Sequence, residues 1–225
     1  MLQKFLVSRR TAVALALVAS GSVLLPMAAQ AQAPSKSALN LAMVAEPPTL
    51  DIQSTPADLV CIIMQHVYEP LFTFDAKAAL VPMLAEAMPK ISADGKLYTI
   101  TLRKGVMLHS GRELNADDVV ASLKRWMDVS PRGKSVAVQV ADMTAKGPLT
   151  VEITLKNAYA PLLSQLAMAS GMAAIMAKES LAQPLREYVG TGPYKFKERK
   201  PDQYVLLTRF DGYVARKEAA SGYGG

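Results

Sequence analysis

The chain has 225 residues, of which 51% are hydrophobic and 20% are charged. This composition supplies enough apolar side chains for the core of one or two domains and excludes a wholly disordered or fibrous chain. The formal charge of +6 would suit a nucleic-acid-binding protein, but three of the 25 basic residues lie within the first ten positions. Without them 22 scattered basic residues face 19 acidic ones, so we expect no basic surface for nucleic acid.

Residues 1–33 have the pattern of an export signal. Three basic residues open the segment: Lys4, Arg9 and Arg10. An uncharged apolar stretch follows over residues 11–25, and small residues at alternate positions then offer cleavage after Ala31 or Ala33. The sequence therefore predicts a removable signal peptide and a mature protein in the periplasm.

Two features of this segment leave alternatives open. Residues 11–29 carry no charge over 19 positions, which would also suit a transmembrane anchor, although Gly21 and Pro26 interrupt the stretch. The pair Arg9-Arg10 suggests the twin-arginine route, whereas the small residues that follow it suit ordinary secretion equally well.

The first half of the mature chain predicts a strand, a helix and a second strand. Residues 39–45 are mainly apolar and are followed by two prolines, which indicates a strand that enters a loop. Residues 57–67 place apolar side chains at steps of three and four and predict a helix. Residues 97–103 alternate between apolar and polar side chains and predict a half-buried strand.

Asn115 marks the start of the next predicted helix. Its side chain can cap the free backbone amides, and Asp117 and Asp118 follow where the helix dipole favours negative charge. We therefore interpret this carboxylate pair as part of the helix start, not as a catalytic pair. Lys124 and Arg125 are expected to point outward near the other end of the helix.

The remaining elements alternate without a strict strand–helix–strand order. The segment 131–133 is expected to end the helix, and residues 150–156 alternate as a strand does. Residues 159–177 are apolar, broken at Gly171, and predict two short helices. Two strands of a hairpin come last: 194–196 and 204–208. The predicted fold class is mixed α/β, or α+β.

The sequence lacks the usual catalytic patterns. No serine stands in Gly-x-Ser-x-Gly, and none has a lysine three residues later. Gly190-Thr191-Gly192 is a fragment of a dinucleotide fingerprint, but Pro193 and a strand follow where a helix would be needed. These residues favour a binding protein over an enzyme.

Cysteine and histidine give no sign of a metal or disulfide site. Cys61 is the only cysteine, and His66 and His109 are the only histidines, too far apart to share helical spacing. We interpret Cys61 as a small buried hydrophobe, His66 as a half-buried helix residue and His109 as a packed loop residue. No metal and no cofactor are expected.

Five stretches, taken in order, resemble the solute-binding proteins of peptide and nickel ABC importers, the extracytoplasmic solute-binding proteins of family 5. The first is Glu46-Pro47-Pro48-Thr49-Leu50-Asp51, just after the first predicted strand. The others are Val67-Tyr68-Glu69-Pro70-Leu71-Phe72-Thr73-Phe74-Asp75, then residues 80–106, residues 109–120 and residues 189–196. Together they span nearly the whole mature chain.

The resemblance implies a periplasmic-binding-protein-like fold (type II, cluster C), in which two lobes close on a solute by hinge motion. Residues 34–225 would form the N-terminal lobe, with core strands at about 38–75 and 190–210 and an inserted subdomain at about 76–189. By analogy, Glu46, Pro47, Pro48, Thr49 and Leu50 would lie at the cleft edge. Gly190, Thr191 and Gly192 would form the return from the subdomain on the hinge side. A plain turn is the alternative for both segments.

Such a protein would deliver a peptide or similar small solute to the permease and ATPase of an ABC importer at the inner membrane, as a monomer. Family members look about twice as long, so we expect the second lobe to be missing from this chain. Residues 34–225 alone should then bind solute weakly and unfold with poor cooperativity. A truncated, non-functional fragment and a sensing or recycling relative remain alternatives, and a secreted hydrolase is a more distant one. Peptides, nickel chelates, glutathione-like conjugates and oligosaccharides all stay open as solutes.

Overall fold

The computed structural model describes residues 38–223. The predicted export signal, with its cleavage candidates Ala31 and Ala33, lies outside the described residues. All helices and strands named below lie in the second of the two units into which the chain divides, which begins at Met43. The strand predicted at 39–45 is wrong: these residues are not in a strand, and Val44 is 97% exposed. Strand propensity alone does not make a strand, because the backbone needs a hydrogen-bonded neighbour.

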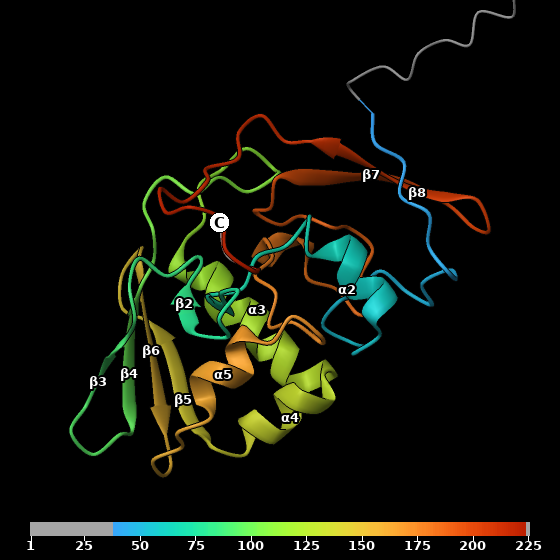
Figure 1. Ribbon diagram of the computed structural model, residues 1–225. Coiled ribbons are helices and arrows are strands. Elements are labelled where there is room, and N and C mark those ends of the chain that lie inside the picture. The colour runs from blue at the N-terminus through green and yellow to red at the C-terminus, as the bar shows by residue number, and fades with distance from the viewer. Residues whose placement is uncertain (1–37, 224–225) are drawn as a thin grey trace, which may run out of the picture. The chain divides into compact units, whose positions relative to one another are not determined.

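A four-stranded antiparallel sheet forms one side of the second unit (Figure 1). Its strands lie in the order β3-β4-β6-β5 and have these bounds: β3 Lys90–Ile91, β4 Leu97–Thr101, β5 Val140–Ala145 and β6 Thr150–Leu155. The strands predicted at 97–103 and 150–156 are thereby confirmed. Their alternation sends Tyr98 and Ile100 of β4, and Val151 and Ile153 of β6, into the interior.

The helix α3, Ala116–Val129, packs on β5 and β6 of this sheet. It begins as predicted: the Asn115 side chain accepts from the backbone N–H of Asp118, and the Asp118 carboxylate accepts from the backbone N–H of Asn115. Pro131 does more than end this helix, since it opens a further helix, α4 (Pro131–Ala137). Proline suits the first turn of a helix because its missing N–H would have no partner there.

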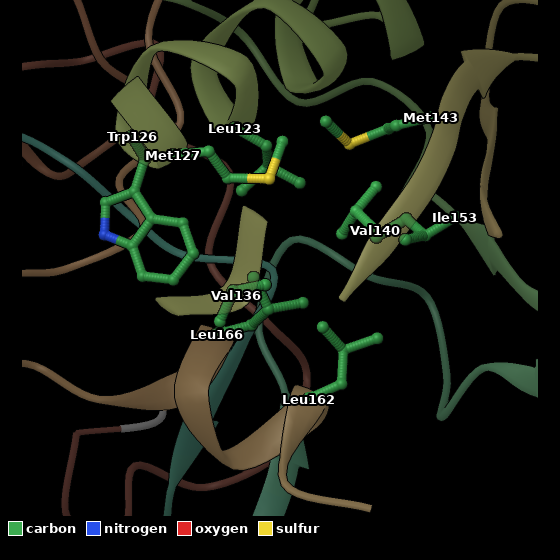
Figure 2. A pocket seen from close by; sticks show the side chains of 9 residues that line it. All are labelled: Leu123, Trp126, Met127, Val136, Val140, Met143, Ile153, Leu162 and Leu166. Carbon is green, nitrogen blue, oxygen red and sulfur yellow. The ribbon is translucent and has the colours of Figure 1, made fainter. Parts of the chain in front are cut away.

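Helices α3, α4 and α5 (Leu162–Ala167) meet β5 and β6 in the first core, the larger apolar cluster around Ile100, Trp126 and Ile153. Figure 2 shows nine side chains that line a small cavity of about 10 Å³ between these elements. All nine are apolar: Leu123, Trp126, Met127, Val136, Val140, Met143, Ile153, Leu162 and Leu166. A void of this size without polar lining has no partners for water and is an ordinary packing defect.

A second core surrounds helix α2, Asp58–Met64, and includes Leu50, Met64 and Tyr68. The hairpin of β7 (Tyr194–Lys200) and β8 (Tyr204–Arg209) packs against it through Phe196, Val205 and Leu207. The predicted helix at 57–67 and the predicted hairpin are both confirmed, although α2 is shorter than expected. The sheet of β1 (Phe72–Phe74) and β2 (Leu80–Pro82) contacts α5.

An extended segment, residues 172–177, separates the two cores. It contradicts the second of the two short helices predicted within 159–177, because only α5 is an α-helix there and a single 3-10 turn, η1 (Lys178–Ser180), follows. Three alternate side chains of the segment lie in the first core: Ala173, Ile175 and Ala177. The other three lie in the second core: Met172, Ala174 and Met176. A strand-like segment buried on both faces has no polar face, so its period of two is hidden in the sequence.

Within residues 38–223 the structure contains no helix that is both long enough and apolar enough to span a membrane.

Candidate functional site

Glu46 joins the predicted cleft-edge segment to the β7–β8 hairpin. Its Oε1 accepts from Arg199 Nε at 3.0 Å and from Arg199 Nη2 at 2.6 Å. Its Oε2 accepts from the backbone N–H of Asp202, in the hairpin turn, at 3.0 Å. The hydrogen bonds from Arg199 and from Asp202 lower the pKa of the Glu46 carboxyl. Arg199 also donates to the carbonyl of Pro47 at 2.7 Å, so one guanidinium anchors two residues of the segment.

The remaining predicted cleft-edge residues differ in exposure. Pro47 and Leu50 are buried, and Leu50 belongs to the second core, whereas Pro48 is exposed and Thr49 is half-buried. The Thr49 hydroxyl accepts from the backbone N–H of Asp51 at 3.1 Å, which shapes the turn. Contact with a solute therefore stays a prediction for this segment, in which Glu46 and Pro48 are exposed and Thr49 is half-buried.

Asp51 and Arg125 form a buried ion pair beneath this segment. The two guanidinium nitrogens Nη1 and Nη2 reach the two carboxylate oxygens at 3.1 Å and 2.6 Å. Nη1 also donates to the side-chain oxygen of Gln53 at 2.7 Å. The prediction that Arg125 points outward is wrong, since its side chain is only 9% exposed. Lys124 alone is exposed, as expected.

Gly190 and Gly192 cross the end of α2 at very short range. A Cβ on Gly190 would stand 2.1 Å from the carbonyl oxygen of Val67, and one on Gly192 would stand 2.5 Å from that of His66. The Gly192 N–H donates to Val67 O at 3.0 Å, as in a strand pair. Close backbone approach, not a special dihedral angle, is what requires glycine at both positions.

The imidazole of His109 bridges the same segment from the other side. Its Nδ1 accepts from the Gly190 N–H at 3.3 Å, so Nε2 carries the proton and donates to the Gly192 carbonyl at 2.9 Å. Burial lowers the pKa of this imidazole, which keeps the ring in the neutral form that the two bonds need. The structure thus joins His109 with the predicted hinge-side segment. This partnership could not be predicted from the sequence, because 81 residues separate His109 from Gly190.

Glu69 is a buried carboxylate near the same place. Burial raises its pKa to about 6, although the hydroxyls of Thr191 and Tyr213 and the charges of Arg103 and Arg216 oppose that shift. The Tyr213 hydroxyl donates to Glu69 Oε1 at 3.1 Å. From the sequence, Glu69 had no expected role beyond its place in a stretch that resembles the family.

The acidic pair at the start of α3 and the cysteine of α2 make structural contacts. The Asp118 carboxylate is fully buried, caps α3 and pairs with Arg112, while Asp117 pairs with Lys178 at 3.2 Å. Cys61 is half-buried, and burial raises the pKa of its thiol, which donates to Ala169 O at 3.2 Å. No group of His, Cys, Asp and Glu side chains in residues 38–223 could hold a metal ion. Together, the hydrogen bonds and ion pairs of these side chains hold backbone segments in place around one end of α2.

The comparison with protein-family models matches residues 79–222, more than half of the chain, to the bacterial extracellular solute-binding proteins, family 5 (middle part). A protein described as a probable peptide ABC transporter periplasmic-binding protein, from Sinorhizobium fredii, is 30% identical over 97% of this chain. The nickel-binding periplasmic protein of Escherichia coli is 31% identical over 68% of it. The chain spans 42% and 30% of the length of these two relatives.

The solved structures agree with the sequence relatives. A dipeptide-binding protein from Pseudoalteromonas, in complex with Met-Leu, superposes with a TM-score of 0.69 at 28% identity. The superposition covers 79% of this chain and 40% of that protein. The neighbours confirm the expectation of a periplasmic-binding-protein-like fold of which this chain covers a part. The chain belongs to family 5 of the bacterial extracellular solute-binding proteins.

Proposed function

We propose that this chain forms the N-terminal part of an extracytoplasmic solute-binding protein that captures peptides or similar small solutes. The protein delivers them to the permease and ATPase of an ABC importer. The observation that carries the proposal is the superposition on a dipeptide-binding protein in complex with Met-Leu. The family match and the peptide and nickel relatives support the same role.

The proposed function includes a cellular location for the protein and a division of the chain into domains. The protein works as a monomer in the periplasm, after cleavage behind Ala31 or Ala33. Residues 34–225 form the first lobe, with an inserted subdomain at about 76–189. Pro48 and Thr49, as accessible members of the segment Glu46–Leu50, lie at the cleft edge. Gly190, Thr191 and Gly192 lie on the hinge side, where the close approach to Val67 supports a rigid crossing.

Native mass spectrometry of the gene product, isolated from its own host, tests this function. We expect a mature start near residue 32 or 34 and a small bound solute that denaturing conditions release. Deletion of the gene should abolish uptake of that solute, and deletion of the partner permease should do the same. A gene product that carries no solute, and whose loss changes no uptake, would contradict the proposal.

A further inference from the structure

One residue, His109, holds the segment Gly190–Gly192 through three hydrogen bonds. Its backbone N–H donates to the Gly190 carbonyl at 2.9 Å. Nδ1 of its ring accepts from the Gly190 N–H at 3.3 Å, and Nε2 donates to the Gly192 carbonyl at 2.9 Å. The loop between β4 and α3, which carries His109, is thereby tied to a segment that lies 81 positions later in the chain.

The Gly190 N–H depends on Nδ1 of His109 for its hydrogen bond, because no other group in residues 38–223 accepts from it. Residues 190–192 are all buried, so bulk water does not replace this acceptor. On its other side the segment contacts Val67, whose carbonyl accepts from the Gly192 N–H at 3.0 Å. A Cβ on Gly190 would stand 2.1 Å from the same carbonyl. The segment therefore has no room to turn toward another acceptor without losing this contact.

The hydrogen bond to Nδ1 is the one of the three that protonation of the ring must break. A neutral imidazole has one acceptor nitrogen, whereas both nitrogens of the imidazolium ion carry a proton and donate. A proton on Nδ1 would face the Gly190 N–H, donor against donor, while the bond from Nε2 to Gly192 remains. The carbonyl of Tyr188 favours the protonated ring and offers the new N–H an acceptor. The Gly190 N–H is then left buried without a partner, which is costly.

The groups around the ring determine when it takes up a proton. Burial is the largest cause that lowers the pKa of His109, and the charge of Lys195 lowers it further, against the carbonyls of Gly192 and Tyr188. The ammonium of Lys195, on β7, donates to the His109 carbonyl at 3.0 Å. Phe210, just after β8, meets the imidazole edge-to-face at 5.0 Å and carries no charge. No carboxylate of residues 38–223 acts on the ring, so it is neutral in a neutral medium and takes up a proton only in an acidic one.

We propose that His109 is a proton-sensitive switch on the segment Gly190–Gly192. In a neutral medium the ring accepts from the Gly190 N–H and holds the segment against the loop between β4 and α3. In an acidic medium Nδ1 takes up a proton and releases this N–H, so the segment opens more often. The switch is a property of the fold and holds for any solute. In the proposed division into domains the segment lies on the hinge side, where acid would loosen the connection between the inserted subdomain and the rest of the lobe.

Hydrogen–deuterium exchange of the full gene product tests the switch in wild type, His109→Gln and His66→Gln. A glutamine at position 109 can accept from Gly190 and donate to Gly192, but it does not titrate. From about pH 7.5 to about pH 4.5, corrected for the intrinsic pH dependence of exchange, protection of the Gly190 amide should fall about tenfold further in wild type and H66Q than in H109Q. Glu69 titrates beside Thr191 in the same range, and the comparison with H109Q removes its contribution. Equal pH dependence in wild type and H109Q would overturn the proposal.

A second measurement keeps the test valid if H109Q does not fold. NMR titration of the gene product, labelled with 15N in histidine and glycine, follows the ring nitrogens of His109 and the amide of Gly190 together. We expect a proton on Nε2 at neutral pH and a shared midpoint below 6.5, the ordinary pKa of histidine. Lys195→Gln keeps a donor for the His109 carbonyl and removes the charge, so it should move this midpoint to higher pH. Lys197→Gln, at an exposed position of β7, is the matched control and should leave it unchanged.

Two results of the NMR titration would overturn the proposal. The first is a Gly190 amide that does not follow the titration of the His109 ring in wild type. The second is a ring that carries its proton on Nδ1 at neutral pH, because such a ring could not accept from Gly190. Equal midpoints in K195Q and K197Q would assign the titration to a group other than His109 and count against the switch as well.

Discussion

Arg125 and Asp51 form a two-point ion pair inside the protein, with side chains that are 9% and 12% exposed. They lie 74 positions apart, on α3 and on the loop before α2, and Gln53 completes the group. The pair therefore fixes the loop that carries the proposed cleft-edge residues to a helix of the first core.

We expect Arg125→Met to destabilise the protein by about 3–5 kcal/mol, because it leaves the Asp51 carboxylate buried without its cation. The double variant Asp51→Asn, Arg125→Met should lose less than this single variant, since no charge is then left unpaired. Urea unfolding followed by circular dichroism measures both. Lys124→Met, at the exposed neighbour, should change the free energy of unfolding by no more than about 0.5 kcal/mol. Equal losses for R125M and K124M would show that the ion pair contributes nothing.

Glu69 should make the protein less stable as the pH rises from about 4.5 to above 6. The pKa of Glu69 is raised from 4.5 to about 6 by burial, so the folded state holds a proton that the unfolded state has already released. Glu69→Gln keeps an acceptor for Tyr213 and removes this titration. Its advantage over wild type should grow from near zero at pH 4.5 to about 2 kcal/mol at pH 7.5, by the usual conversion of a pKa difference. Glu86→Gln, at an exposed position, is the control, and a pH-independent difference for E69Q would refute the assignment.

Gly190→Ala should be far more damaging than Gly111→Ala. The new methyl group at position 190 would overlap the carbonyl of Val67, and overpacking against backbone costs about 3 kcal/mol. At position 111 nothing stands within 4 Å, but φ is +90°, so an alanine there carries backbone strain of about 1–2 kcal/mol. Thermal unfolding of the two variants separates these costs. If the two melted alike, the close crossing at Gly190 would not be rigid.

His109→Phe should cost about 2–4 kcal/mol, although the ring can still stack edge-to-face on Phe210 as His109 does at 5.0 Å. The reason is that the Gly190 N–H and the Gly192 carbonyl, both in buried residues, lose their partner. The other histidine, His66, provides the control. Its ring stacks on Tyr194, and burial lowers its pKa. Within the described residues, this ring makes no hydrogen bond to the segment Gly190–Gly192. We expect His66→Phe to stay within about 1 kcal/mol of wild type in the same denaturant titration.

Local signals in the sequence predicted the local structure well. The cap at Asn115, the alternation of 97–103 and 150–156 and the hairpin after Pro193 all depend on residues a few positions apart. An extended segment that is apolar on both faces was harder to predict. Residues 172–177 carry apolar side chains toward both cores, so neither a helical nor a strand period was visible.

The contacts of the candidate site could not be predicted, because their partners are remote in the chain. Nothing local distinguishes Arg125, which is buried against Asp51, from Lys124, which is exposed. Nothing local in the sequence indicates that the imidazole of His109 forms hydrogen bonds with the backbone of Gly190 and Gly192. Glycine and proline patterns did indicate where the backbone is tight, and the resemblance to a family supplied the rest.

The hydrogen bonds between the segment that begins at Glu46 and the β7–β8 hairpin also have a consequence for the order of folding. They join residues that are 152 to 156 positions apart, from Pro47 and Glu46 to Arg199 and Asp202. Contacts of this separation form late, because the entropy of the intervening chain is lost before they contribute. The sheet around β4 and β6 can assemble from nearer partners, whereas the second core stays uncovered until the hairpin has been synthesised and has docked. The segment on which the proposed cleft depends is thus among the last parts of the molecule to become ordered.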